Sequence, residues 1–184
     1  MLIKLIVNRK DLKTWLAYEK KLYNLTLFDV LTMSEMWVTW KYVKYLRMCE
    51  YLRNSKKKYL LPLFLYYRRK KNILGMKTGL AIGENCVGKG LLIYHNGNVV
   101  INGNSEIGEN LKLHGNNCIG NNGKTFDNPK IGDNVELGVG ASIIGNVEIA
   151  NDVIIGANAT VVNSCLKKGE VLIGVPAKSK NKDK

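Results

Sequence analysis

The strongest constraint on the fold is an aliphatic residue that recurs at every sixth position through the C-terminal half of the chain. A period of six is neither the roughly 3.6-residue repeat of an α-helix nor the simple alternation of a flat sheet. Such a period indicates a chain that coils and places one aliphatic side chain inward on each flat side of the coil. The series consists of Ile101, Ile107, Leu113, Ile119, Ile131, Leu137, Ile143, Ile149, Ile155 and Val161.

A second repeated position, four places after the aliphatic one, carries mostly small or β-branched residues. Sixteen of the eighteen glycines lie beyond Ile82, as expected where tight turns require left-handed backbone angles. We interpret the pattern as a parallel β-helix with three hexapeptides to a turn, in which each coil contacts only its neighbours. An all-β sandwich would instead show strands at irregular spacing. The second series consists of Ser105, Val135, Ala141, Val147, Val153, Ala159 and Cys165.

The register of the repeat breaks in two places. Between Ile82 and Ile101 the phase slips by one residue, and between Ile119 and Ile131 one hexapeptide carries Thr125 where an aliphatic residue is expected. Breaks in a solenoid usually mark loops, and such loops often line the binding face. Both breaks contain polar residues of the kind that a site needs. We therefore expect functional residues there, with a tolerated imperfection of the repeat as the alternative.

Residues 1–80 have a different texture and are predicted to be helical, because aromatic and apolar residues recur there at three- and four-residue spacing. Ser34 is only a weak start signal, since a capping box would place Glu or Gln three residues later. Pro62 predicts that a helix begins or kinks nearby. The recurring residues are Trp37, Trp40, Tyr42, Tyr45, Leu46 and Cys49. We expect a basic α-helical segment over 1–80, a β-helix domain over 81–178 and a disordered basic tail over 179–184.

The net charge of +13 is confined to the N-terminal segment, because residues 1–80 contain 18 Lys and Arg against 5 Asp and Glu, while the rest is balanced. A basic segment suits an anionic polymer, nucleic acid or membrane surface, or it simply keeps a helical surface soluble. The apolar stretch 59–67 lies between the basic clusters 56–58 and 68–71. It could rest on an anionic membrane, although such strips more often pack on their own domain. No motif for reading nucleic acid is recognisable.

The cysteines and the chain's apolar stretches bear on its compartment. None of the four cysteines forms a CxxC pair, which argues against a zinc ribbon or a redox motif, and free thiols fit a reducing cytoplasm. The opening apolar run is too short for a signal peptide, and no apolar stretch reaches the roughly 18 residues needed to span a bilayer. We expect a cytoplasmic protein, with contact at the inner face of the membrane left open.

Three segments resemble the serine acetyltransferase branch of the hexapeptide-repeat acyltransferases: residues 92–110, Pro129-Lys-Ile-Gly-Asp-Asn-Val135 and Gly174-Val-Pro-Ala-Lys178. The similarity covers residues 68–178 and is particularly clear to the short members that O-acetylate capsule and O-antigen sugars. It implies an all-β left-handed parallel β-helix with a short N-terminal α-helical segment. It also implies a homotrimer with acetyl-CoA as co-substrate in the groove between neighbouring chains, and no metal.

The resemblance places His95 at the catalytic position. As general base it would take the proton from the acceptor hydroxyl while that oxygen attacks the thioester, a role suited to a free imidazole with a pKa of roughly 6.5. His114 either reaches the acceptor or is an ordinary surface histidine. The acceptor-binding candidates are Tyr94, His114, Asp127 and Asn128. The cofactor-binding candidates are Gly120, Gly123 and Lys124 of a glycine-rich loop, Ala141 and Ala159 where a small residue lets the cofactor approach the backbone, and Lys178 for a phosphate.

The chain departs from the serine enzymes around this histidine. Those enzymes have Asp before the catalytic histidine, where this chain has Tyr94, and an Arg-His pair where it has Asp127 and Asn128. Their acidic residue that orients the base aligns with Leu80. Because an amino-acid acceptor needs a cation for its carboxylate, we expect the acceptor to be a hydroxyl of a surface-polysaccharide sugar or its precursor. Serine O-acetylation is the alternative.

Other functions on a β-helix fit less well. A zinc-dependent carbonic anhydrase needs three histidines at the metal, and the chain has two. A sugar nucleotidyltransferase needs a preceding nucleotide-binding α/β domain, and residues 1–80 show no strand, glycine loop and helix in that order. A purely structural or binding β-helix is the non-enzymatic alternative. It predicts an unbroken register with no functional histidine at a break.

Overall fold

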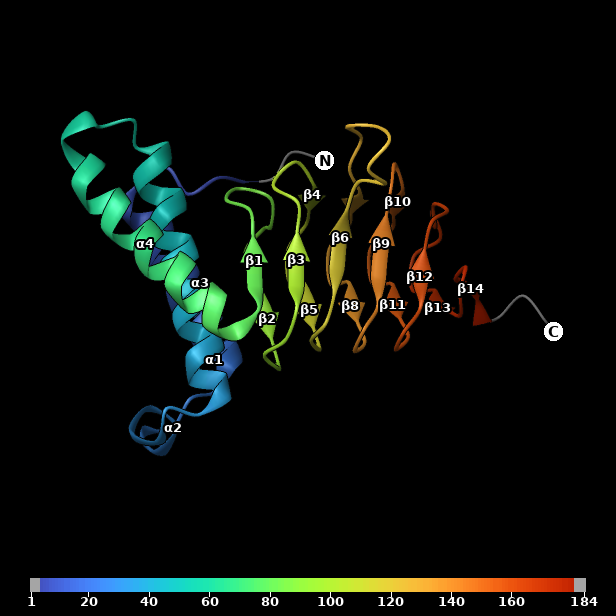
Figure 1. Cartoon of the computed structure of the whole chain (residues 1–184), viewed down its shortest axis with the longest axis horizontal. Coiled ribbons are helices and arrows are strands. Elements are labelled where there is room, and N and C mark those ends of the chain that lie inside the picture. The colour runs from blue at the N-terminus through green and yellow to red at the C-terminus, as the bar shows by residue number, and fades with distance from the viewer. Residues whose placement is uncertain (1–3, 181–184) are drawn as a thin grey trace.

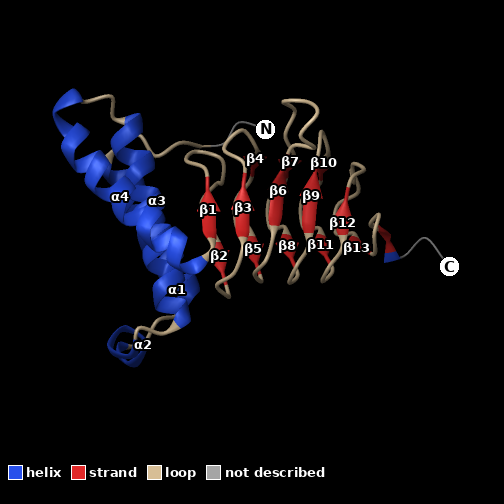
Figure 2. Ribbon diagram, viewed as in Figure 1, coloured by secondary structure: helices blue, strands red, loops and turns tan. Residues whose placement is uncertain are grey.

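The computed structural model describes residues 4–180 and shows a helical unit at one end of a long β-prism (Figure 1). The strands extend from the helices coil after coil towards the C-terminus (Figure 2). No helix within residues 4–180 is long and apolar enough to cross a membrane. The helical unit comprises α1 (Arg9–Tyr23), α2 (Leu27–Thr32), α3 (Glu35–Asn54), the short 3-10 helix η1 (Lys58–Leu60) and α4 (Leu61–Thr78).

The helix boundaries follow local sequence signals. Ser34 caps α3, because its hydroxyl accepts the N–H of Trp37 at 3.3 Å, so the weak signal is a real start. The expectation that a helix begins near Pro62 is confirmed, since α4 carries this proline in its first turn, where the missing N–H leaves no bond unmade. The helix ends at Gly79, whose φ of 75° is left-handed. The first strand starts at the next residue.

Three parallel sheets form the flat faces of the prism, and the predicted parallel β-helix is confirmed; its left-handedness stays a prediction. Each strand pairs with the strand one coil further along, so Ile119 lies beside Ile101 on one side and Ile143 on the other. The first sheet contains β1 (Leu80–Ile82), β3 (Val99–Ile101), β6 (Cys118–Gly120), β9 (Ser142–Ile144) and β12 (Thr160–Val161). The second contains β4 (Glu106–Ile107), β7 (Lys130–Ile131) and β10 (Glu148–Ile149). The third contains β2 (Leu92–Ile93), β5 (Lys112–Leu113), β8 (Glu136–Leu137), β11 (Ile154–Ile155), β13 (Val171–Ile173) and the antiparallel β14 (Lys178–Ser179).

Both repeated positions of the hexapeptide point into the prism. Every member of the six-residue aliphatic series is at most 3% exposed. Ala141, Val153 and Ala159 of the second series are completely buried. Each flat side therefore contributes a large and a small side chain to a narrow core, and the burial of this apolar surface is what makes the coils stack.

The first coil has no preceding coil to pair with, so its backbone N–H and C=O groups need other partners. Side chains of the helical unit supply them. The hydroxyl of Tyr42 accepts the N–H of Ile82 at 2.9 Å, and that of Tyr23 accepts the N–H of Ile93 at 3.0 Å. Burial raises the pKa of Tyr42 to about 12, which keeps this phenol neutral at ordinary pH.

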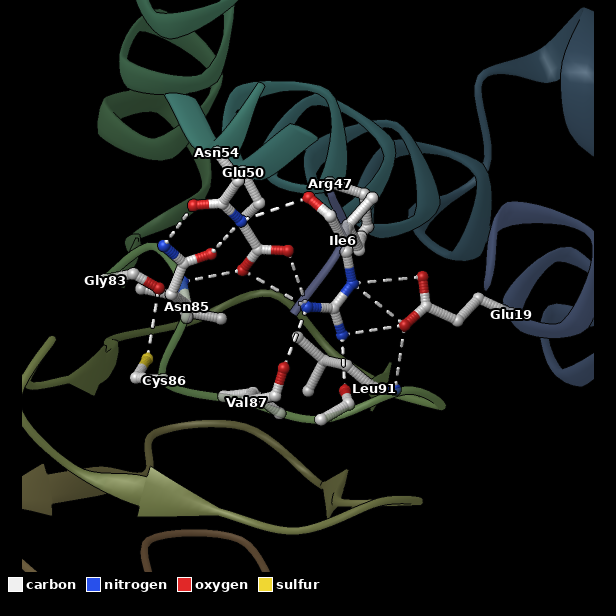
Figure 3. A network of polar contacts seen from close by, with 12 residues as sticks. Ile6, Glu19, Arg47, Glu50, Asn54, Gly83, Asn85, Cys86, Val87 and Leu91 are labelled. Atoms are coloured by element: carbon white, nitrogen blue, oxygen red, sulfur yellow. Dashed lines mark hydrogen bonds and ion pairs between the residues drawn. The ribbon is translucent and has the colours of Figure 1, made fainter. Parts of the chain in front are cut away.

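Arg47 of α3 is the centre of the junction between helices and prism (Figure 3). Its side chain is completely buried, and its guanidinium donates to the carbonyl oxygens of Val87 and Gly88 at 2.9 and 2.6 Å. It also forms ion pairs with Glu19 at 2.8 Å and Glu50 at 2.9 Å. One buried cation is thus fully surrounded by carboxylates and backbone oxygens.

The two carboxylates around this arginine also bind the first coil. Glu19 accepts the N–H groups of Gly90 and Leu91 at 3.1 and 3.2 Å, and Glu50 accepts the N–H of Asn85 at 2.9 Å. Burial raises the pKa of Glu50 in spite of the neighbouring guanidinium. The helical unit therefore acts as a cap that replaces the hydrogen bonds of a missing coil.

Candidate active site

His95 lies on the corner between β2 and β3, where the third sheet passes into the first. Eight positions separate Ile93 from Ile101 across this corner, instead of the six of a regular repeat. Relative to a regular six-residue repeat, the chain has two extra residues at this corner and one fewer between Ile82 and Val87. Together these give the one-residue slip of the register. At this enlarged corner, 61% of the His95 side chain is exposed.

Glycines make room for this corner. Gly97 has a φ of 138° and Gly115, in the coil above, has a φ of 109°, both in the left-handed region that favours glycine. A Cβ on Gly115 would lie 3.4 Å from the Cβ of His95 and from the carbonyl oxygen of Asn96. The histidine corner therefore rests directly on the backbone of the next coil.

Glu35, the first residue of α3, holds His95 from the side of the helical unit. Its Oε2 lies 3.2 Å from Nδ1 of His95, and its Oε1 accepts the N–H of Asn96 at 2.5 Å. Partial burial alone would raise the pKa of Glu35, but the hydrogen bonds from Asn96 and His95 outweigh it and hold this pKa below its ordinary value. Glu35 is therefore an anion near neutral pH.

The anionic state of Glu35 assigns the protons of the imidazole. An ionised carboxylate only accepts hydrogen bonds, so Nδ1 of His95 must carry the proton that they share. In the neutral ring this leaves the lone pair on Nε2, the nitrogen that faces away from the carboxylate. His95 is thus prepared to accept a proton from a group placed beside its exposed edge.

Tyr94 and His114 form a second layer on the same corner. Their rings lie 4.6 Å apart at an angle of 32°. Nε2 of His114 lies 2.9 Å from Glu136 Oε1, and Lys112 pairs with the other oxygen of that carboxylate at 3.3 Å. Burial raises the pKa of Glu136, but the contacts with His114 and Lys112 dominate and lower it. Three predicted residues, Tyr94, His95 and His114, are therefore together at one corner.

The glycine-rich loop lies at the opposite ends of the strands of the first sheet, where the strands end rather than begin. The chain passes from the His114 corner along β6, which ends at Gly120, and then forms the long loop 121–127 that projects above the strands (Figure 1). The loop turns on Asn122, whose Oδ1 accepts the N–H groups of Lys124 at 2.9 Å and Thr125 at 3.0 Å. Thr125, which stands where the repeat would have an aliphatic residue, thus lies in this exposed loop rather than in the core.

Asp127 ends this loop and Asn128 follows it, between the first and second sheets, whereas His95 lies between the third sheet and the first. Asp127 is exposed, and Asn128 is buried and donates from Nδ2 to the carbonyl oxygen of Phe126 at 2.7 Å. The Asn128 Oδ1 is buried without a hydrogen-bond partner among residues 4–180. Within a single chain, these two acceptor-binding candidates therefore lie apart from the histidine corner. The same holds for Gly120, Gly123 and Lys124.

The remaining cofactor candidates lie further along the prism. The side chains of Ala141 and Ala159 are completely buried, so any contact with a cofactor would involve their backbone. Lys178 lies in β14 and lines a cavity of about 570 Å³ at the last coil. Ser179, at the start of the predicted tail, belongs to β14, and residues 181–184 lie outside the described part of the chain.

Sequence reasoning missed both acidic partners of the histidines. Glu35 lies sixty residues before His95, and an acid in the first turn of a helix has an ordinary explanation in the helix dipole. Glu136 precedes an inward leucine by one position, which signals only an outward side chain. Leu80, at the position of the family's orienting acid, is a core residue at 3% exposure.

The comparisons with known proteins bear first on the repeat. Residues 128–163 match the family model described as bacterial transferase hexapeptide (six repeats). A search of curated protein sequences gives no significant match.

Solved structures that resemble the chain include serine acetyltransferases. The soybean apoenzyme is 22% identical with a TM-score of 0.68, and the match covers 91% of this chain and 68% of that one. A serine acetyltransferase in complex with CoA is 20% identical with a TM-score of 0.71, over 93% of this chain and 70% of that one. The enzyme from Brucella abortus strain S19 is 18% identical with a TM-score of 0.71, over 93% and 69%. The likeness thus extends over both the helical unit and the prism, and at this identity it shows a shared fold.

Proposed function

We propose that this protein is an acetyl-CoA-dependent O-acetyltransferase with His95 as its general base. The observation that carries the proposal is an exposed imidazole whose Nδ1 is held by the Glu35 carboxylate at 3.2 Å, on an enlarged corner of a hexapeptide prism. The repeat match to bacterial transferases and the likeness to serine acetyltransferases, one solved with CoA, support the same reaction class.

In the proposed reaction, Nε2 of His95 takes the proton of the acceptor hydroxyl as its oxygen forms a bond to the thioester carbonyl carbon. The carbonyl electron pair moves to its oxygen, and its return breaks the carbon–sulfur bond. The CoA thiolate then leaves and receives the proton from His95. Glu35 stabilises the imidazolium formed between these steps and keeps Nε2 directed at the acceptor.

We further propose a homotrimer, with CoA between neighbouring chains. His95 lies where the strands of the first sheet begin, and the loop with Gly120, Gly123 and Lys124 lies where they end. Because these groups lie apart within a single chain, a groove between two copies is the arrangement that would bring them together. In that groove Lys124 and Lys178 would meet phosphates, and the backbone at Ala141 and Ala159 would line the cofactor.

Two acceptors compete. Serine is favoured by the comparisons, because the three structures above are serine acetyltransferases. A sugar hydroxyl is favoured by the side chains at the corner. Among the described residues Glu35 and Glu136 are anions there, and the nearby Lys112 is already paired. A serine carboxylate needs a cation, and Lys112 at this corner is paired with Glu136, whereas a neutral sugar needs none. We therefore propose a surface-polysaccharide sugar or its precursor as the acceptor and serine as the second candidate.

Release of CoA from acetyl-CoA distinguishes the acceptors. The purified protein is mixed with acetyl-CoA and either free serine or acidic and neutral oligosaccharides, and the free thiol is measured with the His95→Ala variant as the blank. The proposal expects release with a sugar above both the blank and the serine reaction. Robust turnover of serine alone would make the protein a serine acetyltransferase. Transfer that persists unchanged in the blank would remove His95 as the base.

A further inference from the structure

The helical unit carries a surface that the proposed reaction does not use. It lies at the turn between α3 and α4, at the end of the unit furthest from the strands (Figure 1). We call residues 56–70 the tip surface. Five large apolar side chains are exposed there: Tyr59 at 74%, Leu61 at 56%, Leu63 at 42%, Leu65 at 55% and Tyr66 at 53%.

These side chains are not the packing face of α4. The helix packs against α3 and β1 through its other side, where Lys71, Gly75 and Thr78 are buried. In the first two turns of α4, Phe64 and Tyr67 are half-buried, whereas Leu65 and Tyr66 are exposed, so the helix presents apolar side chains both to the helical unit and to solvent. A helix of that kind lacks a partner on its outer face.

The charge of the tip surface has one sign. Residues 51–83 contain no Asp or Glu. The ion pairs of this stretch in the described structure are those of Arg53 and Lys71, and both go to Glu84. The six exposed cations of the tip surface have no ion-pair partner within residues 4–180: Lys56, Lys57, Lys58, Arg68, Arg69 and Lys70.

Aromatic rings lie beside two of these cations. The guanidinium of Arg68 lies 5.7 Å from the ring centre of Phe64, and the ammonium of Lys70 lies 5.4 Å from that of Tyr66. Cations over rings at the boundary of an apolar strip match the interface of a bilayer, where apolar groups enter the acyl region and cations meet headgroup phosphates.

We propose that the tip surface binds the surface of an anionic lipid bilayer, with Tyr59, Leu61 and Leu65 inserted at the headgroup boundary and the six cations on lipid phosphates. Charge complementarity selects this occupant. A two-fold contact with a second copy would set the six cations of one tip against six identical ones. A nucleic acid would satisfy the charges but leave the leucines exposed to water.

Vesicle sedimentation with the full-length protein tests the proposal without reference to acetyl transfer. We expect binding to phosphatidylcholine vesicles that contain phosphatidylglycerol, little binding to phosphatidylcholine alone, and weakening with added salt. Each basic residue at an anionic surface contributes roughly a fivefold gain in partition. Replacing Lys56, Lys57 and Lys58 together by Gln should therefore lower the partition on the order of 100-fold.

The matched control removes the same charge elsewhere in the helical unit. Lys10, Lys13 and Lys20 are exposed on α1, and their joint replacement by Gln should lower binding far less. The double variant Leu61→Ser and Leu65→Ser should weaken vesicle binding at unchanged charge and unchanged molecular mass in solution. If the two triple lysine variants lost vesicle binding equally, the effect would depend on net charge alone, and the proposal would be overturned. A change of oligomeric state in the leucine variant, or tighter binding to duplex DNA than to vesicles, would assign the surface to another partner.

Discussion

The helical unit and the β-prism differ in the polar contacts that they bury. The prism fills its core with aliphatic and small side chains that repeat every six residues, and its backbone pairs coil to coil. The helical unit buries apolar side chains such as Trp40 and Leu46, but it also buries ions: Arg47, Glu19 and Glu50 are each at most 2% exposed and bind the free backbone of the first coil. The prism is thus a sum of nearly equivalent local contacts, whereas the helical unit depends on a few specific long-range ones.

This difference also divides the candidate site. The prism supplies His95, His114 and the glycines that shape the corner, and the helical unit supplies the carboxylate of Glu35. The proposed catalytic corner therefore lies where the two regions meet. Variants in each region should separate what the prism carries from what the helices add.

The largest effect is expected from His95→Ala, which removes the proposed base and leaves the prism intact. Turnover should fall by about two to four orders of magnitude. The melting temperature should stay near that of the wild type, because this side chain is mostly exposed. Steady-state kinetics and thermal melting on the same samples check both points. His114→Ala is the matched control, and its loss should be smaller; near-normal turnover without His95 would end its assignment as base.

Arg47→Ala should produce the largest loss of stability in the helical unit. It would leave two buried carboxylates and two carbonyl oxygens without their donor, and the free energy of unfolding should fall by about 3–5 kcal/mol. In the prism, Ile143→Val removes one buried methylene and should cost only about 1 kcal/mol. Denaturant unfolding measures both. Comparable losses in the two variants would contradict the contrast between the regions.

Glu35→Gln should have an intermediate effect on catalysis and little on folding. Loss of the orienting carboxylate should lower kcat on the order of 10- to 100-fold, as for carboxylates that orient other histidines, with little change in the KM for acetyl-CoA. The pKa of Glu35 is lowered in the folded chain, so its contact is fully present above its ordinary value of 4.5 and is lost as pH falls through the lowered pKa. The kcat deficit should therefore persist throughout the neutral range.

Rescue distinguishes positioning from a structural role of Glu35. Glu35→Asp keeps the charge and should recover part of the lost kcat, while Glu35→Gln keeps the shape and should not. If both variants lose activity together with melting temperature, the carboxylate serves the fold of α3 instead. An unchanged kcat in Glu35→Gln would show that His95 needs no partner from the helical unit.

The sequence predicts the repeat region better than the rest of the chain because the information there is local. A six-residue period names the inward positions without knowledge of any other segment, and Ile101 to Val161 are buried as expected. The break of the period marks the corner of His95, because a β-helix tolerates extra residues only where the chain leaves a flat side. The starts of α3 and α4 follow similarly from Ser34 and Pro62.

The sequence alone thus determined the coiled fold, its inward residues and the position of the exposed histidine. Tertiary structure decided that Arg47 lies inside the junction and that Glu35 contacts His95, sixty residues further along the chain. It also decided that the glycine-rich loop and His95 lie at opposite ends of the strands of the first sheet. The physical reason is the range of the contacts. Hydrophobic periodicity is written into neighbouring residues, whereas an ion pair between distant segments depends on how helices and prism pack, which no local pattern records.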